Sequence, residues 1–263
     1  MPNENSLSDA VHRVVEQWSR VEPVTEGDLT ALAASARNVN EQAIAFLSDL
    51  PPVQAEHHYL SLQLIRAACD HGRGLLFLIE TNFRDMGAPA LALHRSQIEN
   101  FLRGVFLGFL ADEEQREDFL ENDVGVRQKN ENGKWQVLGT KSLAQSVEAF
   151  INELADSPLD DPEKFSRMVT NTWNPLCGLV HGGRAIHALY RDGQGLIGGD
   201  ISLGVLFQCV SNCFVITNFC FMTVIAHIYR LAGIPTDCAL NVAMNDFIEL
   251  QRRIRAKQLA GGA

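Results

Sequence analysis

The sequence predicts an all-α fold, a multi-helix up-down bundle with one small loop or β-hairpin insertion near residues 122–140. Three observations support this class. Apolar residues recur at helical spacing along almost the whole chain. Prolines and glycines divide that pattern into segments of helix length, and one polar stretch interrupts it with a hairpin signal. The 263 residues are enough to bury a sizeable core.

The N-terminal half is expected to contain four helices and a short acidic fifth one. Thr25 has the side chain of an N-cap, and Asp28 follows three residues later, where a carboxylate suits the first turn. Pro51 and Pro52 break the helical pattern. The expected helices cover about residues 7–20, 25–50, 55–82 and 88–110, with Gly87 and Pro89 before the fourth, and the acidic helix begins after Asp112.

The proline pair also suggests a domain boundary. Residues 1–52 are expected to form an N-terminal helical appendage and residues 53–263 the bundle, unless the two make one continuous domain. Within the bundle, residues 122–140 are polar and contain Asn132-Gly133, the strongest short hairpin signal. We therefore expect an exposed loop or a small β-hairpin there.

The C-terminal half returns to the helical pattern. Pro175 is expected to kink one helix, and Gly182-Gly183 to end it as a glycine C-cap. The expected helices cover about residues 141–155, 163–180, 201–232 and 236–258.

One of these helices is long enough to span a membrane. From Ile201 to Ala226 the chain has no charged residue and no histidine. Polar residues nevertheless gather within one sector of roughly 140° on a helical wheel, which a lipid-facing span would not favour. They are Gln208, Ser211, Asn212, Asn218 and Thr223. The pattern favours the central helix of a soluble bundle over a membrane span.

Composition limits the classes of partner. The chain has 22 Lys and Arg against 32 Asp and Glu, a net charge of -10, so long-range attraction to nucleic acid or to an anionic membrane is not expected. Its six cysteines lie in apolar surroundings without metal-ligand spacing, which predicts reduced thiols, no metal site and no cofactor. No secretion signal is evident, so a cytoplasmic location is expected.

The leading site candidate is a charged triplet, Arg95, Glu99 and Arg103, at helical spacing. On a helical wheel Arg95 and Glu99 fall about 20° either side of Phe106, on the margin of an apolar stripe. Ionic groups there are costly unless they are paired or used. Either the triplet is an ion-pair network that fixes helix register, or its spare donors serve an anionic ligand.

His181 is the second candidate. It precedes the two glycines, with Asn174 two turns earlier and Arg184 just beyond. Either its imidazole interacts with the free carbonyls of a helix end, or it faces the triplet and completes a polar pocket.

Weaker candidates come from two other helices. Arg66 and His71 have the Arg-x4-His spacing of HEPN-domain ribonucleases, although the two side chains diverge by about 140° on a straight helix. Gln208 and Asn212 belong to the polar sector of the charge-free helix and would need partners in an apolar core.

Several of these features together resemble a family of uncharacterised bacterial proteins regarded as HEPN-like helical bundles. The resemblance covers about residues 55–232 and implies a helical bundle in a bacterial cytosol, but no known activity. It rests on Cys69 with His71, on Arg95, Ile98, Glu99, Arg103 and Gly104, on the acidic segment 112–115, on Trp173 and on the His-Gly-Gly at 181–183.

Two functional hypotheses follow. The first is a binding or regulatory module, expected to be a homodimer without a membrane partner. Its pocket of Arg95, Glu99, Arg103 and His181 would take a small anion, a nucleotide or a partner segment. The alternative is a HEPN-type, metal-independent ribonuclease or a toxin or defence component acting on RNA. A histidine would then act as general base and an arginine would stabilise the phosphorane charge.

Overall fold

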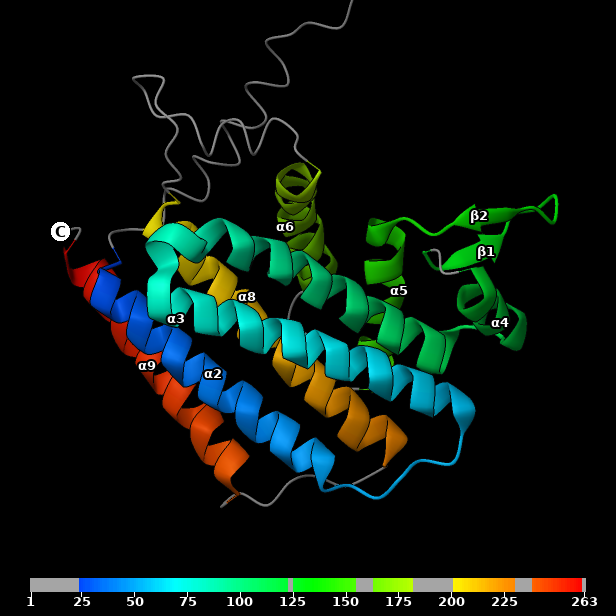
Figure 1. Cartoon of the computed structure of the whole chain (residues 1–263), viewed down its shortest axis with the longest axis horizontal. Helices are drawn as coiled ribbons and strands as arrows, with labels where there is room; N and C mark the ends of the chain where they lie inside the picture. The colour runs from blue at the N-terminus through cyan, green and yellow to red at the C-terminus, as the bar shows by residue number, and fades with distance from the viewer. Residues whose placement is uncertain (1–23, 123–124, 155–162, 182–200, 230–237, 262–263) are drawn as a thin grey trace, which may run out of the picture.

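A computed structural model describes residues 24–122, 125–154, 163–181, 201–229 and 238–261. Within these ranges the chain forms seven α-helices, two π-helical turns and one two-stranded antiparallel sheet (Figure 1). The elements are α2 (Glu26–Ser48), α3 (Glu56–Val105), η1 (Phe106–Leu110), α4 (Glu113–Asn122), β1 (Arg127–Lys129), β2 (Trp135–Val137), α5 (Thr140–Leu154), α6 (Lys164–Val180), α8 (Leu203–Thr223), η2 (Val224–Ile228) and α9 (Ala239–Gly261). The predicted all-α bundle is confirmed. The helix expected at 7–20 lies outside the described residues.

Helix α2 begins where its capping signal predicts. The Thr25 hydroxyl accepts a hydrogen bond of 3.1 Å from the backbone N–H of Asp28. The apolar face of α2 is buried against α3, α8 and α9, and α2 and α9 lie side by side in Figure 1. Residues 26–48 thus contribute to the same core as the rest of the bundle. A separate appendage over residues 1–52 stays a prediction, because residues 1–23 are not described.

Helix α3 is a hairpin of two antiparallel arms that reverses at Asn82 (Figure 1). Asn82 has φ −159° and ψ 64°, and its side-chain oxygen accepts from the N–H of Asp85 at 3.4 Å, as an N-cap does. The first arm covers residues 56–81 and the second 83–105. The second arm begins about five residues earlier than the start expected near residue 88. Pro89 costs that arm only one hydrogen bond, to the carbonyl of exposed Asp85.

The two arms approach closely where small residues face each other. The Ser61 hydroxyl donates to the carbonyl of Gly104 at 2.8 Å. A side chain at Gly104 would lie 3.1 Å from Ile65, and one at Gly108 would lie 2.6 Å from Ser61. This contact fixes the rotation of the second arm, and with it the direction in which the charged triplet points.

A buried polar cluster joins α2, α3 and α8 in the centre of the bundle. His94 contacts Gln97 at 3.0 Å, Gln97 donates to the carbonyl of Cys213 at 3.3 Å, and Asn40 donates to Thr217 at 3.0 Å. All these side chains are almost completely buried. Because buried polar groups are costly when unpaired, the cluster favours one register of these helices.

The charge-free segment forms α8 and η2 and packs against α2 and α3. Among the described residues it is the one helix long and apolar enough to cross a membrane, and 67% of its most apolar window is buried inside the protein. Such burial is consistent with the core helix of a soluble protein, as the polar sector of the helix predicts.

The predicted hairpin is present in the insertion. Strands β1 and β2 pair with Lys129 opposite Trp135, and the loop between them turns through Gly133 at φ 71°. This is a left-handed conformation that glycine adopts without strain. The acidic helix α4 precedes the hairpin and is capped as expected, since the Asp112 carboxylate accepts from the N–H of Gln115 at 2.8 Å. The two elements lie together at one end of the bundle (Figure 1).

Candidate functional site

Two residues of the charged triplet, Glu99 and Arg103, line a small cavity between the second arm of α3 and the hairpin insertion, whereas Arg95 is not among its lining residues. The cavity has a volume of about 150 Å³. Four structural units enclose it: α3, the hairpin with its flanking residues, the first turn of α5, and α6. Its lining residues are Glu99, Leu102, Arg103, Gly125, Val126, Val137, Leu138, Gly139, Thr140, Leu143 and Trp173.

The three charges of the triplet are not equivalent. One Glu99 oxygen, Oε1, accepts a close charge-assisted hydrogen bond from Arg103. The other oxygen, Oε2, lies 4.0 Å from Arg95 Nη2, beyond hydrogen-bonding distance. The side chains of Arg95, Glu99 and Arg103 are 18%, 28% and 26% exposed, so each remains accessible to a small solute.

Aromatic rings hold both guanidinium groups. The Arg95 guanidinium lies 5.0 Å from the ring centroid of Trp173, and that of Arg103 lies 5.9 Å from the centroid of Phe119. Stacking of this kind orients a guanidinium without using its hydrogen-bond donors. The Nε of Arg95 is buried and has no hydrogen-bond partner among the described residues. Because Arg95 does not line the cavity, Arg103 is the guanidinium group of the triplet that a ligand in the cavity would meet.

The N-terminus of α5 adds positive potential to the cavity wall. Thr140 is the first residue of this helix and lines the cavity together with Gly139 and Leu143. The first N–H groups of a helix have no intrahelical acceptor and carry the positive end of its dipole. No acidic side chain occupies the first turn of α5 to neutralise that end.

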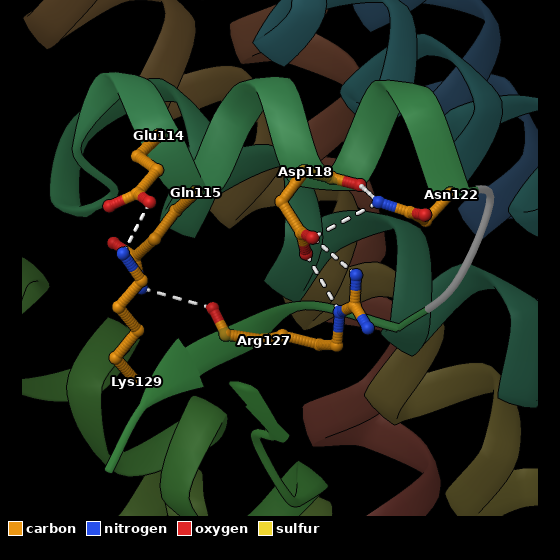
Figure 2. A network of polar contacts seen from close by, with 6 residues as sticks. All are labelled: Glu114, Gln115, Asp118, Asn122, Arg127 and Lys129. Carbon is orange, nitrogen blue, oxygen red and sulfur yellow. Dashed lines mark hydrogen bonds and ion pairs between the residues drawn. The ribbon is translucent and has the colours of Figure 1, made fainter. Parts of the chain in front are cut away.

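A polar network fixes the hairpin wall to α4 (Figure 2). The Asp118 carboxylate, only 8% exposed, accepts from Arg127 Nε at 2.8 Å and from Asn122 at 3.1 Å. The Gln115 side chain donates to the backbone carbonyl of Arg127 at 3.1 Å, and Lys129 pairs with Glu114. The hydrogen bond to Asp118 raises the pKa of Arg127. This network holds β1 in place directly after Val126, a buried wall residue.

Helix α6 contributes Trp173 to the cavity, whereas two of the candidates proposed near its end, Asn174 and His181, are not among the lining residues. Asn174 and His181 are exposed, and the His181 backbone N–H donates to the carbonyl of Cys177 at 3.0 Å as the helix ends. Arg184 lies outside the described residues, as does the expected Gly182-Gly183 cap. Helix α6 also continues through Pro175.

The weaker candidates have structural partners away from the cavity lining. Gln208 donates to Asn212 at 2.7 Å, and Asn212 donates to Thr172 of α6 at 3.4 Å, so these amides join α8 to the helix that carries Trp173. Arg66 is exposed and pairs with Asp70 at 3.1 Å, while His71 is half-buried on the same arm.

Sequence reasoning found the charged triplet but missed the residues that enclose it. In the sequence, Trp173 stands out only as part of the family resemblance, and the hairpin signal predicts only an exposed insertion. Arg95 and Trp173 are far apart in the sequence, so no spacing pattern indicates that their side chains stack. The Asp118–Arg127 pair joins α4 to β1 through two residues nine positions apart in the sequence, and only the hairpin signal pointed to this region.

The fold and the cavity define an all-α bundle protein with an amphipathic site beneath a hairpin insertion. The chain belongs to a family of unknown function, DUF6988, whose model matches residues 65–238. That range contains the triplet, the insertion and all of α8. No curated protein and no solved structure matches the chain.

Proposed function

We propose that the protein is a binding module whose cavity takes a small monoanion, with a carboxylate at Arg103 and the N-terminus of α5. The observation that carries the proposal is the charge balance of the site. The triplet has two guanidinium groups for one carboxylate, a net charge of +1, although only Glu99 and Arg103 line the cavity itself. The helix end adds a further partial positive charge. The site attracts one negative charge in a protein whose net charge is -10.

The size of the cavity supports a small ligand. An apolar protein cavity of about 150 Å³ holds a molecule of the size of benzene, with about six non-hydrogen atoms. A nucleotide, with more than about twenty such atoms, would not fit inside it. Among the ligand classes expected from the sequence, the small anion is therefore the one that the geometry favours.

Isothermal titration calorimetry with two monoanions, acetate and isovalerate, and with the zwitterion valine tests the proposal. At least one should bind saturably, and Arg103→Met should weaken that binding by about tenfold or more, because a charge-assisted hydrogen bond is lost. Methionine keeps much of the apolar stem that packs on Phe119.

The matched control is Arg73→Met, on the other arm of α3. Arg73 is half exposed and pairs with Asp70 at 2.9 Å, and it does not line the cavity. Its variant should bind like the unmodified protein. If none of the three carboxylates binds, or if the two variants behave alike, the cavity is not an anion site.

Four expectations from the sequence remain proposals. They are the HEPN-like character of the bundle, the bacterial origin, the cytoplasmic location and the homodimer. No observation among the described residues favours the ribonuclease or defence alternative. Arg66 pairs with Asp70, and His181 does not line the cavity at which Glu99 and Arg103 lie.

A further inference from the structure

The cavity has a negative group as well as a positive one. Glu99 and Arg103 both line it, so a ligand with only a negative charge would lie beside the Glu99 carboxylate as well as beside its Arg103 partner. Like charges at such distances disfavour binding. A ligand that carries both charges would satisfy both side chains.

One Glu99 oxygen forms only a long ion pair among the described residues and can accept hydrogen bonds from such a ligand. Oε1 accepts from Arg103, whereas Oε2 accepts no hydrogen bond within the part of the chain that the structure describes and lies 4.0 Å from Arg95. An ionised carboxylate can accept several hydrogen bonds, and an ammonium group offers three donors. Glu99 Oε2 is therefore placed to accept from a cationic group.

The other walls of the cavity are apolar. Leu102, Val126 and Leu143 are buried, and Leu138 and Trp173 are half-buried beside them. Their surface would bury an aliphatic chain of a few carbons and gain the free energy of removing it from water. The volume of about 150 Å³ limits the whole ligand to roughly six to nine non-hydrogen atoms.

From these three observations we infer that the ligand is a small aliphatic α-amino acid of about the size of valine. Its carboxylate binds Arg103 and the first N–H groups of α5, and its ammonium group binds Glu99 Oε2. Its side chain lies against the apolar walls. This inference rests on the proposed function and adds the second charge and the aliphatic side chain.

A comparison of valine with two truncated analogues tests the inference on the unmodified protein. Isovalerate lacks the ammonium group, and isobutylamine lacks the carboxylate. By calorimetry valine should bind at least about tenfold more tightly than either analogue, because each analogue forms only one of the two charge-assisted contacts that valine forms.

The variant Glu99→Gln assigns the ammonium site. It should weaken valine binding by about tenfold and leave isovalerate binding unchanged or stronger, so the preference for valine disappears. Thermal unfolding of the variant checks that it folds, and the analogue series on the unmodified protein is independent of that check. The inference is overturned if isovalerate binds as tightly as valine in the unmodified protein.

The outcomes separate the two proposals. Binding of isovalerate equal to that of valine, with loss of both in Arg103→Met, keeps the monoanion site and removes the amino-acid assignment. Absence of binding by valine and isovalerate alike overturns the amino-acid assignment, and absence of acetate binding as well overturns the anion site.

Discussion

At the scale of single residues, His94 is the titratable group that the fold holds most firmly in its neutral form. It is completely buried and contacts Gln97 through Nδ1, and its Nε2 has no partner among the described residues. Burial lowers the pKa of His94 from 6.5 to about 4, while the contact with Gln97 opposes this shift. His94 therefore lowers the free energy of unfolding in acid but not at neutral pH.

The sign of this effect gives a pH prediction. Between pH 6.5 and 4 the unfolded chain takes up a proton at His94 that the folded protein refuses, so the free energy of unfolding falls with decreasing pH. The expected loss from this residue is about 3 kcal/mol. Urea unfolding at pH 7 and at pH 4.5 measures it. The variant His94→Gln should lose less stability than the unmodified protein, whereas exposed His181→Gln should follow the unmodified protein. If His94→Gln and the unmodified protein lose the same free energy of unfolding between pH 7 and pH 4.5, the assignment is contradicted.

At the scale of elements, the start of α6 is secured by a side chain from another helix. Glu148 of α5 is 3% exposed, and its carboxylate accepts from the backbone N–H groups of Phe165 at 2.7 Å and Ser166 at 3.2 Å. It therefore caps the first turn of α6 from a neighbouring element. This contact helps to set the position of α6, the helix that brings Trp173 to Arg95.

Removal of this cap should destabilise the protein. Glu148→Ala leaves two buried N–H groups without an acceptor, so the free energy of unfolding should fall by about 2 kcal/mol or more. Glu148→Gln keeps an acceptor and should lose less. The control is Glu153→Ala, an exposed position on the same helix, which should change stability by less than about 0.5 kcal/mol. Equal effects of the two alanine variants in urea unfolding would show that the cap contributes nothing.

The hairpin wall offers a second test at this scale. Asp118→Ala removes the carboxylate that holds Arg127, so the amides of β1 should exchange with deuterium at least about tenfold faster. The same variant should weaken carboxylate binding, although Asp118 does not line the cavity. Glu114→Ala removes an exposed ion pair with Lys129 and should leave exchange and binding nearly unchanged, since surface pairs contribute little. An exchange pattern that is the same in both variants would remove Asp118 from this positioning role.

At the scale of the whole molecule, the main feature is the burial of the most apolar helix, α8, inside the bundle. Helix α8 and the turn η2 bury most of their surface against α2 and α3, and four of the six cysteines lie in the same core. Burial raises the pKa of Cys213 to about 12, so its thiol stays protonated. The bundle thus accommodates its most apolar helix internally.

This arrangement predicts that the protein is extracted without detergent. Lysis in plain buffer followed by ultracentrifugation should leave it in the supernatant, and size-exclusion chromatography should give the same elution volume with and without a mild detergent. Recovery only in the detergent-solubilised pellet would mean that α8 inserts into a membrane and is not buried in the core.

Much of the fold was predictable because its signals are local. Thr25 with Asp28, Asp112 with Gln115, and the glycine of the hairpin turn act within a few residues of chain, and all lie where expected. The start of the second arm of α3 was misplaced by several residues. Asn82 both ends one helix and caps the next, and a tight packing contact between the arms stabilises the reversal.

The sequence by itself determined the helical class, most helix boundaries, the hairpin and the charged triplet, since spacing along one helix decides which charges share a face. Only the tertiary structure decided what meets that triplet. Trp173 and His181 lie eight residues apart on α6, about 12 Å along its axis and about 80° around it, so one rotation of α6 can present only one of them. That rotation depends on packing between distant elements and on the Glu148 cap, and it brings Trp173 rather than His181 to the cavity.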